Sequence, residues 1–157
     1  MNSADIHQVQ ILTPIGALTI YCRNEFLTEI KFTNINNKLY CTHNAFTREV
    51  ARQLDAYFKS ADFQFDLPLN YSATPHQEKV WRALMDIPRG HVKTYGELAT
   101  LLHSSPRAIG QACGANPIPI VIPCHRVVSK AGLGGFMHQA QGEFLDIKRQ
   151  LLAHEQH

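Results

Sequence analysis

The stretch Ile118-Pro119-Ile120-Val121-Ile122-Pro123-Cys124-His125-Arg126-Val127-Val128 decides how the rest of the chain is interpreted. Its apolar residues predict a buried, strand-like segment, yet a thiol, an imidazole and a guanidinium follow directly after it. Burying polar groups costs free energy unless they are paired, and a conflict between local polarity and local burial is typical of functional sites. We therefore interpret Cys124 as a nucleophile and the rest of the chain as its support.

The sequence alone is also compatible with a purely structural Cys124 next to a histidine on the surface. A lone buried cysteine is usually an inert small hydrophobic residue, which is what we expect of Cys22 and Cys41. Neighbouring side chains on an extended strand point to opposite faces. Cys124 and His125 can therefore cooperate only if the backbone turns after Pro123 or if water connects them.

Cysteine and histidine residues also occur in metal, redox and hydrolase sites. The chain has nine histidines and four cysteines. None of them shows the ligand spacing of a structural zinc site, so neither a metal nor a cofactor is expected. Cys113 and Cys124 flank the proline-rich run, and their spacing leaves a redox pair open. A cysteine hydrolase would need a histidine and an orienting Asn or Asp nearby in space, which residue order does not test.

The composition is that of a globular protein of modest charge. The 157 residues are 45% hydrophobic and 18% charged, which allows one domain of average size or two small ones. A net charge of +2 is compatible with nucleic acid but does not indicate it. No export signal opens the chain, no apolar run approaches the roughly 20 residues that span a bilayer, and the cysteine spacing is typical of reduced thiols. We expect a soluble, cytoplasmic protein without membrane contacts.

Residues 1–72 are predicted to form an α+β domain. Apolar residues recur at the period of half-buried strands over residues 7–33. From about residue 44 to 60 the spacing changes to that of a helix with one buried face. Alternation over residues 63–69 predicts one more edge strand. No cluster of catalytic residue types is found in this half.

Residues 73–157 are predicted to form a mostly helical domain. Thr74-Pro75-His76-Gln77 and Thr94-Tyr95-Gly96-Glu97 each place a threonine N-cap three residues before Gln or Glu, which is the capping box that starts a helix. A further short helix is predicted from Arg107 to about Gly114, and with the preceding one it has the outline of a helix-turn-helix. A final amphipathic helix is predicted from about Phe144 to His154.

These motifs resemble the O6-alkylguanine-DNA alkyltransferase family, also called methylated-DNA–protein-cysteine methyltransferases. The resemblance runs from about Thr74 to Glu155. It is carried by Asn116-Pro117-Ile118-Pro119, Pro123-Cys124-His125-Arg126-Val127, Thr94-Tyr95-Gly96-Glu97-Leu98-Ala99, Arg107 and Leu151-Leu152-Ala153-His154-Glu155. It implies an α+β fold in which a small antiparallel sheet with a covering helix, like ribonuclease H, precedes a mostly helical winged-helix or helix-turn-helix domain.

The resemblance implies a single-turnover DNA-repair enzyme. The family transfers an alkyl group from guanine O6, with thymine O4 as a further lesion, to its own cysteine and remains alkylated. Cys124 matches the acceptor, and His125 matches the base that acts through a water and is oriented by Glu155. Asn116 matches the residue that holds the surrounding turn, and Tyr95 matches the tyrosine that protonates the departing base.

The implied partner is double-stranded DNA with alkylated bases, bound with little sequence preference by a monomer. The target atom is hidden in the base stack, so the nucleotide must be flipped out. Arg107 matches the family arginine that enters the duplex and fills the gap. The other predicted DNA contacts are Tyr95, Ala108, Gln111, Ala112 and Gly114, and the predicted base pocket comprises Cys113, Val127, Val128, Phe136, Met137 and Lys148.

Some positions depart from the family pattern. Cys113 places a second thiol where the human-type members of the family have an apolar residue lining the cleft. The segment from Met137 to Asp146 is longer than the usual link to Lys148. Cys22 lies near a zinc-ligand position of some members, but the partner ligands are absent. His76 replaces the phenylalanine that often follows the Thr-Pro pair.

Cys124 distinguishes alkyl transfer from two alternative functions. Non-catalytic lesion-binding relatives carry tryptophan in place of the cysteine, so the cysteine argues against that class. A winged-helix regulator would keep its function after Cys124→Ala, whereas a repair protein would lose it.

Overall fold

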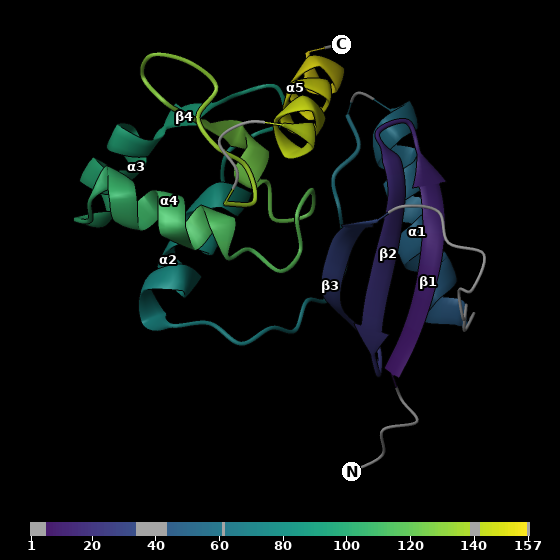
Figure 1. Cartoon of the computed structure of the whole chain (residues 1–157). Coiled ribbons are helices and arrows are strands. Elements are labelled where there is room, and N and C mark those ends of the chain that lie inside the picture. The colour runs from purple at the N-terminus through teal and green to yellow at the C-terminus, as the bar shows by residue number, and fades with distance from the viewer. Residues whose placement is uncertain (1–5, 34–43, 61, 139–141, 157) are drawn as a thin grey trace. The chain divides into compact units, whose positions relative to one another are not determined.

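The computed structural model describes residues 6–33, 44–60, 62–138 and 142–156. They form two compact units, Met1–Tyr71 and Ser72–His157 (Figure 1). Cys41 lies outside the described residues. No helix in the described ranges is long and apolar enough to cross a membrane.

The first unit is a three-stranded antiparallel sheet with one helix against it. Strands β1 (Ile6–Thr13), β2 (Gly16–Arg23) and β3 (Phe26–Thr33) pair in chain order, and helix α1 (Ala45–Lys59) packs on the sheet. The apolar residues that face each other across this interface are fully or almost fully buried; they include Leu18, Ile20, Ile30, Val50, Leu54 and Tyr57. The predicted α+β fold is confirmed.

The prediction of an edge strand over residues 63–69 is wrong. The segment makes one isolated bridge, between Leu27 and Leu69, with hydrogen bonds from Leu27 N to Pro68 O and from Asn70 N to Leu27 O. Pro68 has no N–H to donate, so the ladder cannot continue through it. The backbone N–H of Asp66 donates instead to the side chain of Gln53 on α1.

The second unit is built mainly from helices, each beginning near the residue that the sequence predicts. Thr74 caps α2 (Pro75–Met85) and Thr94 caps α3 (Tyr95–Leu102), both with complete capping boxes. Helix α4 (Pro106–Gly114) begins one residue before the prediction, with Ser105 as its N-cap. The final helix, α5, spans Glu143–Glu155.

Residues 118–128 do not form the strand that their apolar pattern predicts. Ile122 N donates to Ile118 O, so the chain turns back on itself, and Cys124–Arg126 then form the short 3₁₀ helix η2. Only Val127–Val128 are extended, as strand β5 beside β4 (Lys93–Thr94). The prolines at positions 119 and 123 lack the N–H groups that a ladder requires, and Ile120 adopts a φ of 76°, which is rare for a β-branched residue.

Candidate active site

The turn after Pro123 places Cys124 and His125 in one 3₁₀ helix, where their side chains are not held on opposite faces as in a strand. Cys124 is 3% exposed and lines a cavity of about 800 Å³. The cavity is bounded by the start of α3, by α4 and by residues 129–138. A buried thiol at the base of a large cavity is accessible to a ligand that enters the cavity.

Asn116 fastens the turn that carries the thiol. It is 2% exposed; its Nδ2 donates to Ile122 O at 2.7 Å and its Oδ1 accepts from Ile118 N at 2.9 Å. The amide also hydrogen-bonds to Cys124, which favours the thiolate. Asn116 therefore satisfies buried backbone groups on both sides of the turn, as a structural hinge requires.

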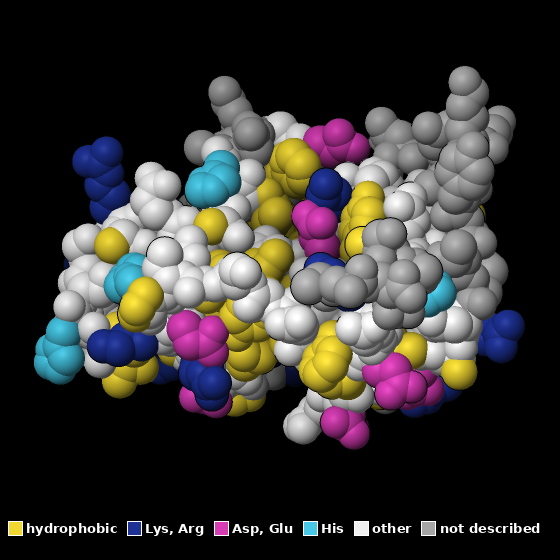
Figure 2. All heavy atoms as spheres, turned by 90° about the horizontal axis from the view of Figure 1, so that it is seen from below, with side chains coloured by type: hydrophobic (Ala, Val, Ile, Leu, Met, Phe, Trp, Pro, Cys, Tyr) yellow, Lys and Arg dark blue, Asp and Glu magenta, His cyan; other side chains and the backbone are white. Residues whose placement is uncertain are grey.

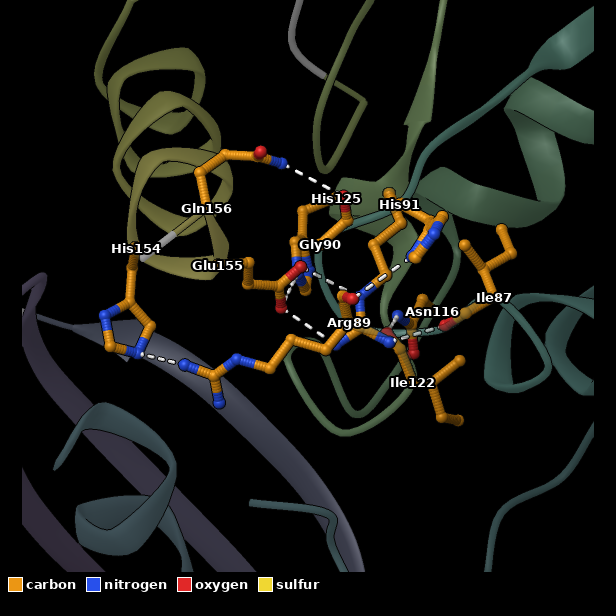
Figure 3. A network of polar contacts seen from close by, with 11 residues as sticks. Ile87, Arg89, Gly90, His91, Asn116, Ile122, His125, His154, Glu155 and Gln156 are labelled. Carbon is orange, nitrogen blue, oxygen red and sulfur yellow. Dashed lines mark hydrogen bonds and ion pairs between the residues drawn. The ribbon is translucent and has the colours of Figure 1, made fainter. Parts of the chain in front are cut away.

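Glu155, the last residue of α5, joins the two residues that follow the thiol. Its Oε2 lies 2.8 Å from His125 Nε2. Arg126 donates to both carboxylate oxygens, from Nε to Oε1 at 2.9 Å and from Nη2 to Oε2 at 2.8 Å. Figure 3 shows Glu155 lying against His125 at the end of α5. Arg126 Nη1 also donates to Ile87 O at 2.7 Å, which ties the network to the residues after α2. Arg126 was part of the sequence motif, but no role was predicted for it.

His125 is set up as a neutral base. It is fully buried, and burial lowers its pKa below the ordinary 6.5 despite the nearby carboxylate. Because Nε2 faces Glu155, we assign the ring proton to Nε2, which leaves Nδ1 as the basic nitrogen. Nδ1 has no hydrogen-bond partner among the residues that the structure describes. The geometry therefore leaves this nitrogen free to take a proton.

The resting Cys124 is a thiol. Burial raises its pKa to about 11, while the hydrogen bond from Asn116 and the charge of Lys148 act in the opposite direction. The thiolate, not the thiol, is the nucleophile. Reaction at neutral pH therefore needs a base that removes the thiol proton as the substrate reacts.

The free energy of unfolding is expected to fall when the pH is lowered through the ordinary histidine range. The pKa of His125 is depressed in the folded protein, so the unfolded chain binds the proton first and acid favours unfolding. The loss is up to about 1.4 kcal/mol per pH unit for one proton. Urea denaturation just above and about one unit below pH 6.5 measures it. The exposed-site control His91→Gln should show the same loss, and greater stability at the lower pH would contradict a buried neutral His125.

Tyr95, the first residue of α3, also lines the cavity. Its hydroxyl donates a long hydrogen bond of 3.4 Å to Gly135 O, and burial raises its pKa to about 12. Gly134 makes this position possible: its φ is +75°, and an added Cβ would lie 2.8 Å from the Tyr95 ring. Tyr95 therefore stays protonated and can donate a proton inside the cavity.

Half of the predicted base pocket lines the cavity. Cys113, Phe136 and Met137 do so, whereas Val127, Val128 and Lys148 are not among the described residues that bound it. Lys148 is fully buried behind the cavity wall, and its Nζ donates to the carbonyls of Val127, Leu133 and Gly135 at 2.6–2.7 Å. The assignment of Val127, Val128 and Lys148 to the base pocket stays a prediction. A sequence motif does not distinguish a residue that lines a cavity from one that supports its wall.

Helix α4 divides the predicted DNA contacts into exposed and buried positions. Arg107 and Gln111 are exposed and Ala108 is partly exposed. Ala112 is 3% exposed, and its carbonyl accepts the Trp81 indole N–H at 2.8 Å, so it belongs to the core; its DNA contact stays a prediction. Gly114 faces a side chain that the sequence did not single out, His138.

Charges of both signs are intermixed on one face of the molecule (Figure 2). Lys and Arg side chains lie among Asp and Glu on the face drawn in Figure 2, without a single basic patch. This agrees with a net charge of only +2.

Comparison with known proteins gives consistent matches over both units. Residues 9–71 match the family model "6-O-methylguanine DNA methyltransferase, ribonuclease-like domain", and residues 75–157 match "6-O-methylguanine DNA methyltransferase, DNA binding domain". A methylated-DNA–protein-cysteine methyltransferase of Mycolicibacterium paratuberculosis is 40% identical over 151 residues, covering 91% of this chain and 88% of the relative.

Solved structures agree with this match. The O6-methylguanine methyltransferase of Mycobacterium tuberculosis superposes with a TM-score of 0.81 at 35% identity, covering 96% of this chain and 93% of the other. The structure of the same organism's protein in complex with DNA gives a TM-score of 0.77 at 36% identity, covering 96% and 92%.

Proposed function

The chain belongs to the 6-O-methylguanine DNA methyltransferase family, and we propose that it repairs DNA by moving the alkyl group of an O6-alkylated guanine to its own Cys124. The observation that carries this proposal is the buried Cys124 thiol at the base of the cavity, next to a histidine held by a buried carboxylate. A family resemblance gives the reaction class, and this geometry supplies the nucleophile and its base.

The transfer step needs a thiolate, an alkyl carbon and a leaving group. The Cys124 sulfur attacks the carbon bound to guanine O6, the S–C bond forms, and the C–O bond breaks with its electrons moving to O6. The thiol proton passes through a water to Nδ1 of His125, while Glu155 holds Nε2 and stabilises the imidazolium that forms. The thioether has no low-energy route back to the thiol, so each chain acts once.

Tyr95 supports departure of the guanine. As electrons move to O6, the base becomes more basic and a nearby proton donor stabilises it. Tyr95 lines the same cavity as Cys124, and its raised pKa of about 12 keeps the hydroxyl protonated at neutral pH, so that it can donate a hydrogen bond to O6. We assign proton donation to Tyr95 on these grounds.

DNA is the partner, and α4 is the element that we assign to enter the duplex. The M. tuberculosis relative was crystallised with DNA, and Arg107 lies exposed on the first turn of α4. An inserted side chain stabilises the gap that a flipped base leaves. We propose that the protein binds DNA through phosphate contacts with little sequence preference. We further propose that it acts as a monomer in the cytoplasm, where thiols stay reduced.

Arg107→Ala is expected to slow transfer from O6-alkylguanine in duplex DNA at least about tenfold, the scale of the cost of unstacking a base without support. Reaction with free O6-benzylguanine should change much less, because the free base needs no flipping. Both rates can be followed by intact mass. Arg149→Ala, which removes an exposed arginine paired with Asp146 on α5, is the matched control and should affect neither substrate. Equal losses with both substrates would contradict the assigned role of Arg107.

The proposed function is tested by incubating the protein with an oligonucleotide that carries one O6-methylguanine. Intact mass should show the gain of one methyl group per chain, saturating at one equivalent even with excess DNA. A protein that binds the lesion and gains no mass would be a recognition protein, and the proposal would fail.

A further inference from the structure

Helix α4, which carries Arg107, follows α3 after a short turn, residues 103–105. His103 ends α3 in the left-handed conformation, with a φ of 53°, and Ser104 N donates to Ala99 O at 2.8 Å. Left-handed backbone is uncommon for residues other than glycine and persists only where the surrounding structure holds it. The conformation of this turn therefore needs support from the residues around it.

Support for the turn comes from His76, the second residue of α2. Its Nε2 lies 2.8 Å from Ser104 Oγ, a distance typical of a hydrogen bond, in which either group can donate. Both residues are partly buried, so this bond is stronger than it would be in bulk water. Ser104 directly precedes Ser105, whose Oγ accepts from Ala108 N at 3.1 Å and caps α4. The bond therefore holds the chain immediately before α4 begins.

Helix α2 is attached to α4 near both ends of α4. The two helices pack against each other (Figure 1), and towards the end of α4 the Trp81 indole N–H donates to Ala112 O at 2.8 Å. A helix that is attached at one point can pivot about it, whereas a second attachment fixes its direction. Because Arg107 lies on the first turn of α4, the bond between His76 and Ser104 is the attachment closer to it in sequence.

We infer that His76 is a positioning residue for repair of duplex DNA: by holding Ser104, it fixes the start of α4 and thereby the place from which Arg107 enters the duplex. The inference rests on the proposed function and on the role assigned there to Arg107. His76 is not among the described residues that bound the cavity, so it takes no part in the chemical step. Its contribution is to hold the inserting side chain in place before DNA binds, which lowers the entropy cost of inserting it.

The test measures the single-turnover rate of methyl transfer from an O6-methylguanine duplex at saturating DNA, by intact mass. His76→Leu and Ser104→Ala remove the hydrogen bond from either side, so each should slow transfer about fivefold, the scale of one net hydrogen bond. His76→Gln and Ser104→Thr keep a polar group that can make the bond and should retain most of the wild-type rate.

Double variants separate positioning of Arg107 from a general loss of structure. In the Arg107→Ala background there is no side chain left to position, so His76→Leu should slow transfer no further. His103→Asn is the matched control: it replaces an exposed histidine of the same turn by a residue that tolerates the left-handed conformation, and it should keep the wild-type rate.

The outcomes distinguish this inference from the proposed function. If the wild-type protein gains no methyl group from the duplex, the proposed function fails and the inference fails with it. If the wild type transfers methyl, but His76→Leu and Ser104→Ala do not slow transfer alike, or His76→Leu slows it as much in the Arg107→Ala background, the inference alone is overturned. A loss that both variants share and that disappears without Arg107 supports it.

Discussion

Cys124→Ala is expected to bind alkylated DNA and to accept no alkyl group. The substitution removes the only atom in the proposed mechanism that can carry the alkyl carbon, and loss of a nucleophile costs at least about 10³-fold in rate in other systems. The fold should survive, because alanine fits the space of a buried cysteine that makes no disulfide. Intact mass after incubation with the O6-methylguanine oligonucleotide measures transfer, and circular dichroism checks the fold.

Cys22→Ala is the matched control for this prediction. Cys22 is also fully buried, and burial likewise raises its pKa to about 11, but it lies in the β-sheet of the first unit. Transfer should therefore persist in Cys22→Ala. A Cys124→Ala protein that still gains mass would mean that another residue accepts the alkyl group.

Glu155→Ala is expected to lower the free energy of unfolding by about 3–5 kcal/mol, the cost of removing one partner from a buried ion pair. It would leave the Arg126 guanidinium and His125 Nε2 without the carboxylate that both contact. Transfer should slow as well, because nothing then holds the imidazole in the tautomer with a basic Nδ1. Urea denaturation measures the first effect and single-turnover transfer the second.

Asp146→Asn is the control for Glu155 on the same helix. Its carboxylate pairs with Arg149 at the surface, and exposed ion pairs contribute about 0–1 kcal/mol. The two carboxylates should therefore differ by several kcal/mol. Similar small losses in both variants would contradict the view that Glu155 anchors the site.

Helix starts could be predicted from the sequence because they depend on neighbouring residues. The Thr74 and Thr94 capping boxes need only a side chain and a backbone N–H three residues apart, and both form as predicted. The edge strand at residues 63–69 failed because pairing depends on a distant partner and on Pro68. The strand predicted over residues 118–128 does not form, because its apolar residues are buried around a turn that Asn116 holds by hydrogen bonds. An apolar run in the sequence does not distinguish such a turn from a strand.

The site was predicted from motifs, and its geometry was not. The motif named Cys124, His125 and Glu155, but 30 residues separate His125 from Glu155, and only the fold brings them to 2.8 Å. Lys148 was assigned to the base pocket, whereas in the structure its ammonium group donates hydrogen bonds to three backbone carbonyls. His138 carried no motif signal, and its close contact with Gly114 joins two residues that no local pattern relates.

The most direct test of the account is to locate the transferred methyl group. No lysine or arginine separates Cys113 from Cys124, so trypsin releases both in one peptide, and fragmentation of that peptide must assign the methyl to one sulfur. After reaction with O6-methylguanine DNA, we expect a single methyl on Cys124 and an unmodified Cys113. A methyl group on Cys113, or none on this peptide, would contradict the central claim.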